Sequence, residues 1–534
     1  MSDDPAVPAE SRSHAALGRR RLASALAPLL GLLLVCSVHL VVSAQPEWSP
    51  RPDAARYLAT ARSLARGEGY TYLGQPFTLR PPGFSVLLAP MTAFVGLDFR
   101  ALEIFTGATA LVAAAALFLL FRARLGTPLA GALTLWFWFH PERIRLCREI
   151  MADVPGFAAL AIALLAIEAR DRKPSRGRDV AVGVLVAVAA YLRTAHLALL
   201  PALALGALRA APDAGAVREC GDSSDSRAAL RRRVAGVVAS VAVAAALYGP
   251  WLVYSARVGS TAEPGGIDFD SYWQSMSRAD PIDTRSGSLG VSGWITRVGE
   301  NATLYAALVG SDLGSTELSG ASLAISAALV AAWLARLAKR RSVLDWVVGI
   351  ELAELLLYFA RQSRLLLPAH VLLVAVALEA VRDLVARVLP LRLGEALLAA
   401  TLVCVTVGER GPDPAELGKR IAYYDLVRMA RYLRTETSAR QVVAGDHGAI
   451  YGLLADRPVL SLRAMLRRRP EMLGEALARS HIDVLVAERG GALEGFVSAA
   501  AERAGAVRDL GHYAVVALEA AAERADVPRG PENP

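Results

Sequence analysis

Cysteine is scarce in this chain, with four among 534 residues. Cys36 and Cys404 lie inside apolar runs, Cys220 lies in a basic segment, and Cys147 stands alone. Neither a disulfide framework nor a zinc-binding spacing can be built from these positions. The sequence therefore gives no support to redox chemistry or to a structural metal held by cysteine.

Two further patterns are missing from the sequence. No Gly-x-Ser-x-Gly nucleophile elbow is present, so Asp446-His447-Gly448 is interpreted as a turn and not as part of a hydrolase site. No internal repeat of the kind found in transporters is visible either. The sequence therefore gives no support to a hydrolase with a nucleophile elbow or to a transporter built from internal repeats.

Apolar sequence, by contrast, is abundant. Hydrophobic residues make up 54% of the chain, and the mean hydropathy is +0.38. This composition predicts a multi-pass membrane protein. The net charge of +8 could suggest a nucleic-acid partner, but the basic residues fall in short clusters between apolar runs. Such clusters orient membrane spans, so we expect no nucleic acid to bind.

The apolar runs predict a mostly α-helical protein with about eleven transmembrane helices. The first run could also be a signal peptide, but it is longer than the roughly 7 to 15 residues of a signal core, which favours an uncleaved helix. A short run at 83–95 is predicted to lie in the membrane interface. The predicted spans are 22–42, 100–121, 129–139, 154–167, 180–192, 195–208, 234–254, 321–337, 343–359, 365–381 and 395–407.

Basic clusters also predict which side each loop faces. Arginines precede the first span, so the tail 1–21 is expected in the cytoplasm, and the spans of region 22–408 then alternate. This places two loops, 46–98 and 255–319, on the outer side. From residue 409 the pattern becomes soluble. Region 409–525 predicts a small extracytoplasmic α/β domain with strands at 441–445, 457–461, 482–487 and 513–518, followed by a flexible tail at 526–534.

The first outer loop contains a candidate for chemistry. Asp53 stands at the start of a helical pattern and has Arg56 and Tyr57 close by in the sequence. A single carboxylate in such a loop can act as a general base. An acid at the start of a helix can also serve as an N-cap, so both roles stay open at this point.

A second group of acids follows the predicted span 129–139. Glu149 and Asp153 are expected on the same outer side as Asp53, and they share a face if this stretch is helical. A close acid pair can bind a divalent cation or raise one pKa. Asp153 precedes Val-Pro and can equally be the cap of the next helix. A divalent cation therefore stays open as a cofactor, and the metal ligands are unknown.

Several motifs together resemble a known family. In order they are DAARYLATARSLARGEGY, RPPGFSVLLAP, REIMADVPGFAALAIALLAI, LYGPWLVYSARVGS and SRLLLPAHVLLVAVALEAV. Their order and spacing resemble the GT-C integral-membrane glycosyltransferases, in the family-39-like group of protein mannosyltransferases and the lipid A aminoarabinose transferase. The resemblance covers most of the chain and implies a GT-C-like fold. It also implies sugar transfer from a polyprenyl phosphate on the outer face.

The resemblance assigns two acids and shows two departures. It implies that Asp53 is the loop acid of the family and Asp153 its second acid. Some relatives carry an acid shortly before the proline of this loop, where the chain has Leu79-Arg80-Pro81. No second acid lies next to Asp53 as it does in others. The first departure weakens the case for a metal in this loop.

The proposed chemistry needs cations beside one carboxylate. An outer active site excludes nucleotide sugars as donors, and a phosphate leaving group needs cationic stabilisation more than a general acid. Asp53 is predicted to remove the proton of the acceptor hydroxyl while the configuration inverts. Arginines at the outer ends of helices suit a lipid phosphate, although snorkelling to the interface is the open alternative. The substrate-binding candidates are Arg56, Tyr57, Arg80, Glu149, Arg193, Arg361 and Arg364.

The predicted function is thus a glycosyltransferase of the cell membrane, with its N-terminus in the cytoplasm and its C-terminal domain outside. The expected partners are a polyprenyl-phosphate-linked sugar, a glycan, lipid or protein acceptor, and the bilayer. A transporter or flippase of lipid-linked glycans is the alternative, because Glu351 and Glu354 lie inside a predicted span. A non-catalytic glycan-binding membrane protein is the third hypothesis.

Overall fold

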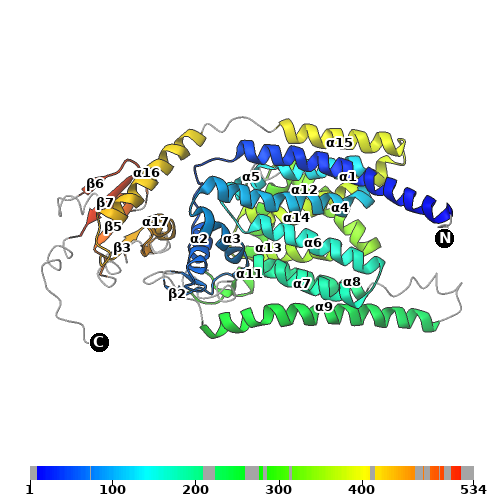
Figure 1. Cartoon of the computed structure of the whole chain (residues 1–534), viewed down its shortest axis with the longest axis horizontal. Coiled ribbons are helices and arrows are strands. Elements are labelled where there is room, and N and C mark those ends of the chain that lie inside the picture. Colours follow the sequence, from blue (N-terminus) through cyan, green and yellow to red (C-terminus); the bar gives the residue numbers. More distant parts are fainter. Residues whose placement is uncertain are drawn as a thin grey trace, which may run out of the picture.

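A computed structural model shows a helical bundle joined to a smaller part that contains a sheet (Figure 1). It describes residues 9–72, 74–208, 223–258, 276–280, 286–311, 316–408, 415–462, 473, 481–491, 493–497 and 507–518. The predicted tail 526–534 and residues 259–275 of the predicted second outer loop lie outside these ranges. The sheet lies beyond α2 and α3 at one end of the bundle, which we call the site end.

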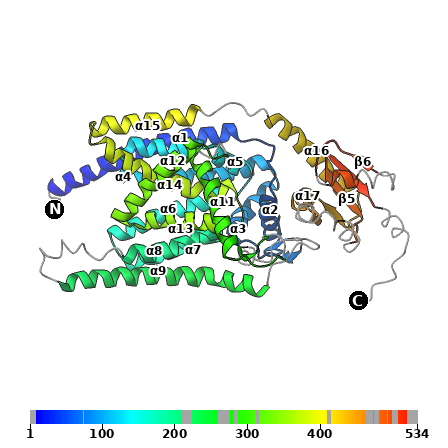
Figure 2. The same ribbon diagram turned by 180° about the vertical axis from the view of Figure 1, so that it is seen from behind.

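The helices and strands follow the apolar and amphipathic runs of the sequence. Figures 1 and 2 show α1 and α15 along one edge of the bundle and α9 along the opposite edge. The helices are α1 (Ala9–Ser43), α2 (Pro52–Ala65), α3 (Gly83–Val95), α4 (Phe99–Phe139), α5 (Pro141–Arg148), α6 (Asp153–Arg172), α7 (Arg176–Leu192), the 3-10 helix η1 (Thr194–Ala198), α8 (Leu199–Leu208), α9 (Ser223–Val258), α11 (Val291–Gly310), α12 (Gly320–Arg340), α13 (Val343–Leu357), α14 (Ser363–Val385), α15 (Leu391–Gly408), α16 (Ala415–Thr435) and α17 (Gly448–Ala455).

Among the described residues, five helices are long and apolar enough to cross a membrane, or six if the bent pair α5 and α6 is one span. The five are α1, α4, α9, α12 and α14. The predicted spans at 180–192, 195–208 and 343–359 coincide with helices of 17, 10 and 15 residues, which are short for a bilayer core of about 30 Å. Several apolar helices therefore make this a multi-pass membrane protein.

Helix α4 consists of two halves that break at Gly126, where φ is 79° and ψ is 165°. A positive φ favours glycine, and this break lies between the predicted spans 100–121 and 129–139. Phe99, at the start of α4, stacks on Trp48, and Trp138, near its end, donates a hydrogen bond to His39 close to the end of α1. Both ends of α4 therefore lie at the site end, and the two halves run in opposite directions.

The predicted second outer loop, 255–319, contains a helix that its polar sequence did not predict. Within 255–319 the structure has α11, a helix of 20 residues that packs against α12 and α13. Its inner face carries Tyr305, Leu308 and Val309, which are buried. Polar residues on the other face lower the apolar content of this segment, which makes its helical pattern hard to recognise in the sequence.

The smaller part is built on a mixed sheet with the strand order β4-β3-β5-β7-β6. Strands β3, β4 and β5 run parallel, while β7 runs antiparallel to β5 and β6. Four of the strands lie where they were predicted, and β6 was missed because its three residues are all exposed. A short hairpin, β1 (Thr71–Tyr72) and β2 (Gln75–Pro76), follows α2; the sheet strands are β3 (Val443–Gly445), β4 (Val459–Ser461), β5 (Val484–Glu488), β6 (Val507–Asp509) and β7 (Tyr513–Ala517).

Candidate active site

Asp53 lies in the first turn of α2, but it is not the N-cap. Arg51 occupies that position with extended backbone angles, and Pro52 fills the first helical position. The helix buries Ala54, Leu58 and further small residues against its neighbours, which fixes the direction in which Asp53 projects. The carboxylate therefore does not serve as the N-cap, and its side chain contacts arginines.

Both oxygens of Asp53 accept hydrogen bonds from guanidinium groups. Arg80, in the loop before α3, donates to Oδ1 at 2.8 Å, and Arg364, at the start of α14, donates to Oδ2 at 2.6 Å. Arg56 lies one turn along α2 at 3.7 Å from Oδ1. Burial alone raises the pKa of the Asp53 carboxyl, but Arg80, Arg364 and Arg56 outweigh burial and hold this pKa well below its usual range.

Asp153 joins the same group of charges from another helix. It lies in the first turn of α6, is 4% exposed, and pairs with Arg193 at 2.8 Å. Arg364 lies 3.8 Å from its other carboxylate oxygen. Because Arg364 contacts both Asp53 and Asp153, the two acids belong to one cluster.

We call this cluster the arginine network. It contains four guanidinium groups and two carboxylates, so it carries two more positive than negative charges. Guanidinium groups in excess of carboxylates suit an anionic ligand, because they form charge-assisted hydrogen bonds with phosphate and carboxylate oxygens. Its members come from α2, the loop before α3, α6, the end of α7 and α14: Asp53, Arg56, Arg80, Asp153, Arg193 and Arg364.

Solved structures share the arrangement of this chain, although no family model and no curated protein matches its sequence. ArnT from Cupriavidus metallidurans bound to undecaprenyl phosphate superposes with a TM-score of 0.55 at 14% identity, covering 91% of this chain and 97% of that one. Apo ArnT gives 0.55 at 15% identity, covering 94% and 98%. The oligosaccharyltransferase AglB from Archaeoglobus fulgidus gives 0.50 at 12% identity, covering 88% and 70%.

The chain has the GT-C fold. The predicted resemblance to the GT-C membrane glycosyltransferases is therefore confirmed at the level of the fold. At these identities the likeness shows the fold and assigns no residue a role, so any role rests on the geometry of the arginine network.

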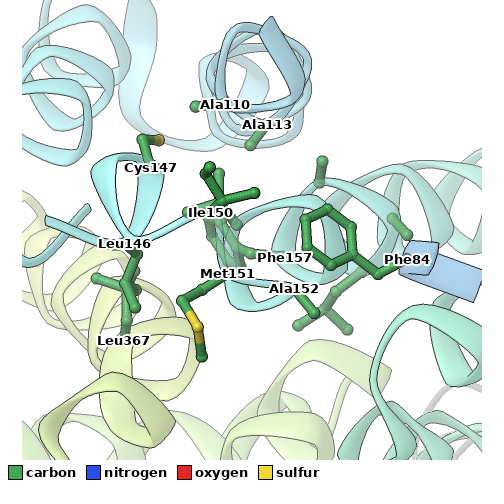
Figure 3. Packing of buried hydrophobic residues seen from close by; sticks show 14 of the residues in the cluster. Phe84, Ala110, Ala113, Leu146, Cys147, Ile150, Met151, Ala152, Phe157 and Leu367 are labelled. Carbon is green, nitrogen blue, oxygen red and sulfur yellow. The ribbon is translucent and has the colours of Figure 1, made fainter. Parts of the chain in front are cut away.

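The predicted pair of Glu149 and Asp153 on one helical face is wrong. Between them α5 ends and α6 begins, with a bend of 119°, and Ile150 takes a left-handed φ of 58°. Figure 3 shows Ile150 packed in the buried cluster at this turn, which supplies the contacts that hold a strained backbone in place. Glu149 instead accepts hydrogen bonds from Arg51 at 2.8 Å and Arg145 at 2.7 Å.

Two other predicted residues lie apart from the arginine network. Arg361 donates a hydrogen bond to the Asn301 side chain at 3.1 Å and pairs with Glu300. Tyr57 is buried against Phe84, and the Arg80 guanidinium lies 5.9 Å from the centre of its ring. Tyr57 therefore supports Arg80 from the interior, whereas Arg361, in the link between α13 and α14, is bound to side chains of α11.

A divalent cation finds no ready ligand set in the described part of the chain. No group of three or more His, Cys, Asp or Glu side chains lies close enough together there to hold a metal ion. Asp53, Asp153 and Glu149 all bind guanidinium groups. The carboxylates at this site therefore suit arginines better than a metal, and the cation stays a prediction.

The two glutamates that suggested a transporter lie behind the site. Glu351 is buried, and one of its carboxylate oxygens lies 3.2 Å from Nδ1 of His196. Gly156 of α6 packs against both His196 and Arg193, close enough that a methyl group there would lie 3.1 Å from the ring and 3.2 Å from the Arg193 Cβ. Sequence reasoning missed this pairing because the partners are 155 residues apart.

Helix α17, next to the sheet, contacts the helix that carries Asp53. Arg62 and Arg66, near the end of α2, pair with Asp456 at 3.0 Å and 2.9 Å. Arg62 also donates to the Leu453 carbonyl at the end of α17. A polar cleft of about 160 Å³ lies beside these contacts. The helical bundle and the smaller part therefore meet where α17 contacts α2.

Proposed function

We propose that this chain is a membrane glycosyltransferase that moves a sugar from a polyprenyl phosphate to an acceptor on the outer face of the cell membrane. The observation that carries the proposal is the arginine network, in which four guanidinium groups surround two carboxylates where helix ends meet. The fold shared with ArnT, which was solved with undecaprenyl phosphate, supports a lipid phosphate as the donor.

In the proposed reaction an oxygen of the Asp53 carboxylate takes the proton of the acceptor hydroxyl. The acceptor oxygen forms a bond to the anomeric carbon, while the bond from that carbon to the phosphate oxygen breaks on the opposite face. The electron pair of the broken bond stays on the lipid phosphate, and the configuration inverts.

The charge of the network fits this step. The donor phosphate is a diester with one negative charge, and it leaves as a monoester with a charge of about −1.5 to −2. Arg80, Arg193 and Arg364 would gain interaction energy as that charge develops, which lowers the barrier and not only the energy of the bound donor. One carboxylate base and a cationic phosphate site are therefore sufficient.

The basic end of the bundle supports the proposed sidedness. Arg122, Arg124, Lys173 and Arg340 lie at the end of the bundle remote from the sheet, where α4 breaks and where α6 and α12 end. Basic residues collect on the cytoplasmic side of membrane proteins. We therefore place the site end and the sheet outside and the N-terminus in the cytoplasm.

The test is a transfer assay with the purified full chain and radiolabelled polyprenyl-phosphate sugars, with and without a chelator. Replacing Asp53 by Asn removes the base, and we expect transfer to fall by at least about a hundredfold. The matched control is Asp98→Asn, because Asp98 caps α4 and asparagine caps helices as well. Full transfer by the Asp53→Asn protein would overturn the proposal.

A further inference from the structure

The arginine contacts of Asp53 conflict with its proposed role as a general base. A general base is most effective when its pKa lies near the working pH. Both oxygens of Asp53 are instead held by Arg80 at 2.8 Å and Arg364 at 2.6 Å, and Arg56 lies behind at 3.7 Å. These contacts lower the pKa of Asp53 more than burial raises it. In this state the carboxylate is a weak proton acceptor.

We propose that Asp53 and the donor phosphate compete for Arg80 and Arg364, so that donor binding releases the Asp53 carboxylate to act as the base. This inference rests on the proposed function and adds an order of events to it. The two oxygens of a carboxylate and two non-bridging oxygens of a phosphate accept the same guanidinium hydrogen bonds, so one ligand can replace the other.

The surroundings of the two arginines allow such an exchange. The backbone of Arg80 is anchored, because the Tyr70 hydroxyl donates to its carbonyl at 3.0 Å, while its guanidinium ends a flexible stem over the Tyr57 ring. Arg364 has a second acid, Asp153, at 3.8 Å. Each guanidinium can therefore turn toward a phosphate without moving its helix or loop.

The exchange has a consequence for the order of binding. Without a donor, Asp53 cannot take the proton of an acceptor hydroxyl, and the acceptor site is inactive. Once the phosphate holds Arg80 and Arg364, the carboxylate keeps only Arg56 nearby and becomes a stronger base. Donor binding therefore precedes acceptor activation.

The test measures the binding of undecaprenyl phosphate to the full chain in nanodiscs of phosphatidylcholine by native mass spectrometry. Four proteins form a cycle: wild type, Asp53→Asn, Arg80→Gln with Arg364→Gln, and the triple variant. Removing the competing carboxylate should tighten binding by about tenfold in the background with both arginines. In the background without them, Asp53→Asn should change binding by less than about twofold.

The outcomes separate this inference from the proposed function. If Asp53→Asn leaves binding unchanged or weakens it, or if its gain persists without the two arginines, competition is disproved while the phosphate site stands. If the double arginine variant binds as tightly as wild type, the phosphate site itself fails, and with it the proposed function. Gel filtration and thermal melting verify folding, and Asp53→Ala provides a second variant if Asn keeps one arginine bond.

Discussion

Arg361 and Arg364 test the assignment of the site at the scale of single residues. They lie three positions apart, and both were predicted to hold a phosphate. In the structure only Arg364 contacts Asp53 and Asp153, while Arg361 is bound to Asn301 and its neighbour on α11. Replacing Arg364 is therefore expected to slow sugar transfer, and replacing Arg361 serves as the matched control.

We expect Arg364→Gln to lower the rate of sugar transfer by at least about a hundredfold, because a cation is lost where charge develops on the phosphate. Arg361→Gln should stay within about threefold of wild type, since its guanidinium is half exposed and its ion pair is of the weak surface kind. The measurement is the initial rate at saturating donor. Equal losses in both variants would contradict the assignment of the network.

Single residues also show why the site was only partly predictable. The acids and arginines could be named, because they lie at the predicted outer ends of helices, where a lipid phosphate would bind. Their partners could not be named, since Asp53 meets Arg80 across 27 positions and Arg364 across 311. Such pairs are decided by how the helices pack.

At the scale of elements, α2 is held at both ends. Its first turn carries Asp53 in the arginine network, and its last turns carry Arg62 and Arg66 on Asp456. Asp456 itself takes a left-handed φ of 53° at the end of α17. The sheet is thus in a position to influence the orientation of the helix that carries the proposed base.

We expect Asp456→Asn to loosen this contact and to lower the transfer rate by about two- to fivefold while leaving undecaprenyl phosphate binding intact. The lost ion pairs are partly exposed, so each is worth about 0.5–1 kcal/mol. Faster hydrogen exchange in α17 would report the loosening. Unchanged exchange in α17 would show that the contact does not hold the two elements together.

The same contact has an expected pH dependence. Burial raises the pKa of the Asp456 carboxyl, but Arg66 and Arg62 lower this pKa by more than burial raises it. The pKa of Asp456 in the folded protein therefore lies below the ordinary 3.8. A group with a lowered pKa stabilises the folded state above its unfolded pKa. The contribution is therefore complete above about pH 5 and is lost as the pH falls below about 4.

The elements were predictable where one signal dominated. Long apolar runs and short apolar strands such as 482–487 lie close to where they were expected. Segments with mixed signals were not predictable. Helix α11 has a polar face, and the turn at Ile150 depends on a buried cluster whose contacts stabilise a left-handed residue. Tertiary packing decides such segments, and packing cannot be seen in a single window of sequence.

At the scale of the whole molecule, the two ends of the bundle differ in chemistry. The site end carries the arginine network and the sheet, and the remote end carries a buried ionic cluster in which Arg336 pairs with Asp345 and Glu379. The direction of the molecule in the membrane therefore decides which donors can reach the site.

Cysteine labelling tests this direction. In a background with Cys220 and Cys404 replaced by Ser, Arg440 lies exposed in the turn before β3 and Lys173 lies exposed at the remote end of α6, so each is replaced by Cys in turn. We expect a membrane-impermeant maleimide to label Arg440→Cys in intact spheroplasts and Lys173→Cys only after permeabilisation. The native Cys36 and Cys147 are buried and should stay unlabelled.

The reverse labelling pattern would change the chemistry as well as the topology. With the arginine network in the cytoplasm, nucleotide sugars would reach Asp53 directly, and the site would not need a sugar that crosses the membrane on a lipid. Undecaprenyl phosphate could then bind as an acceptor phosphate and not as the leaving group. The labelling experiment therefore distinguishes the proposed donor class without knowledge of the sugar.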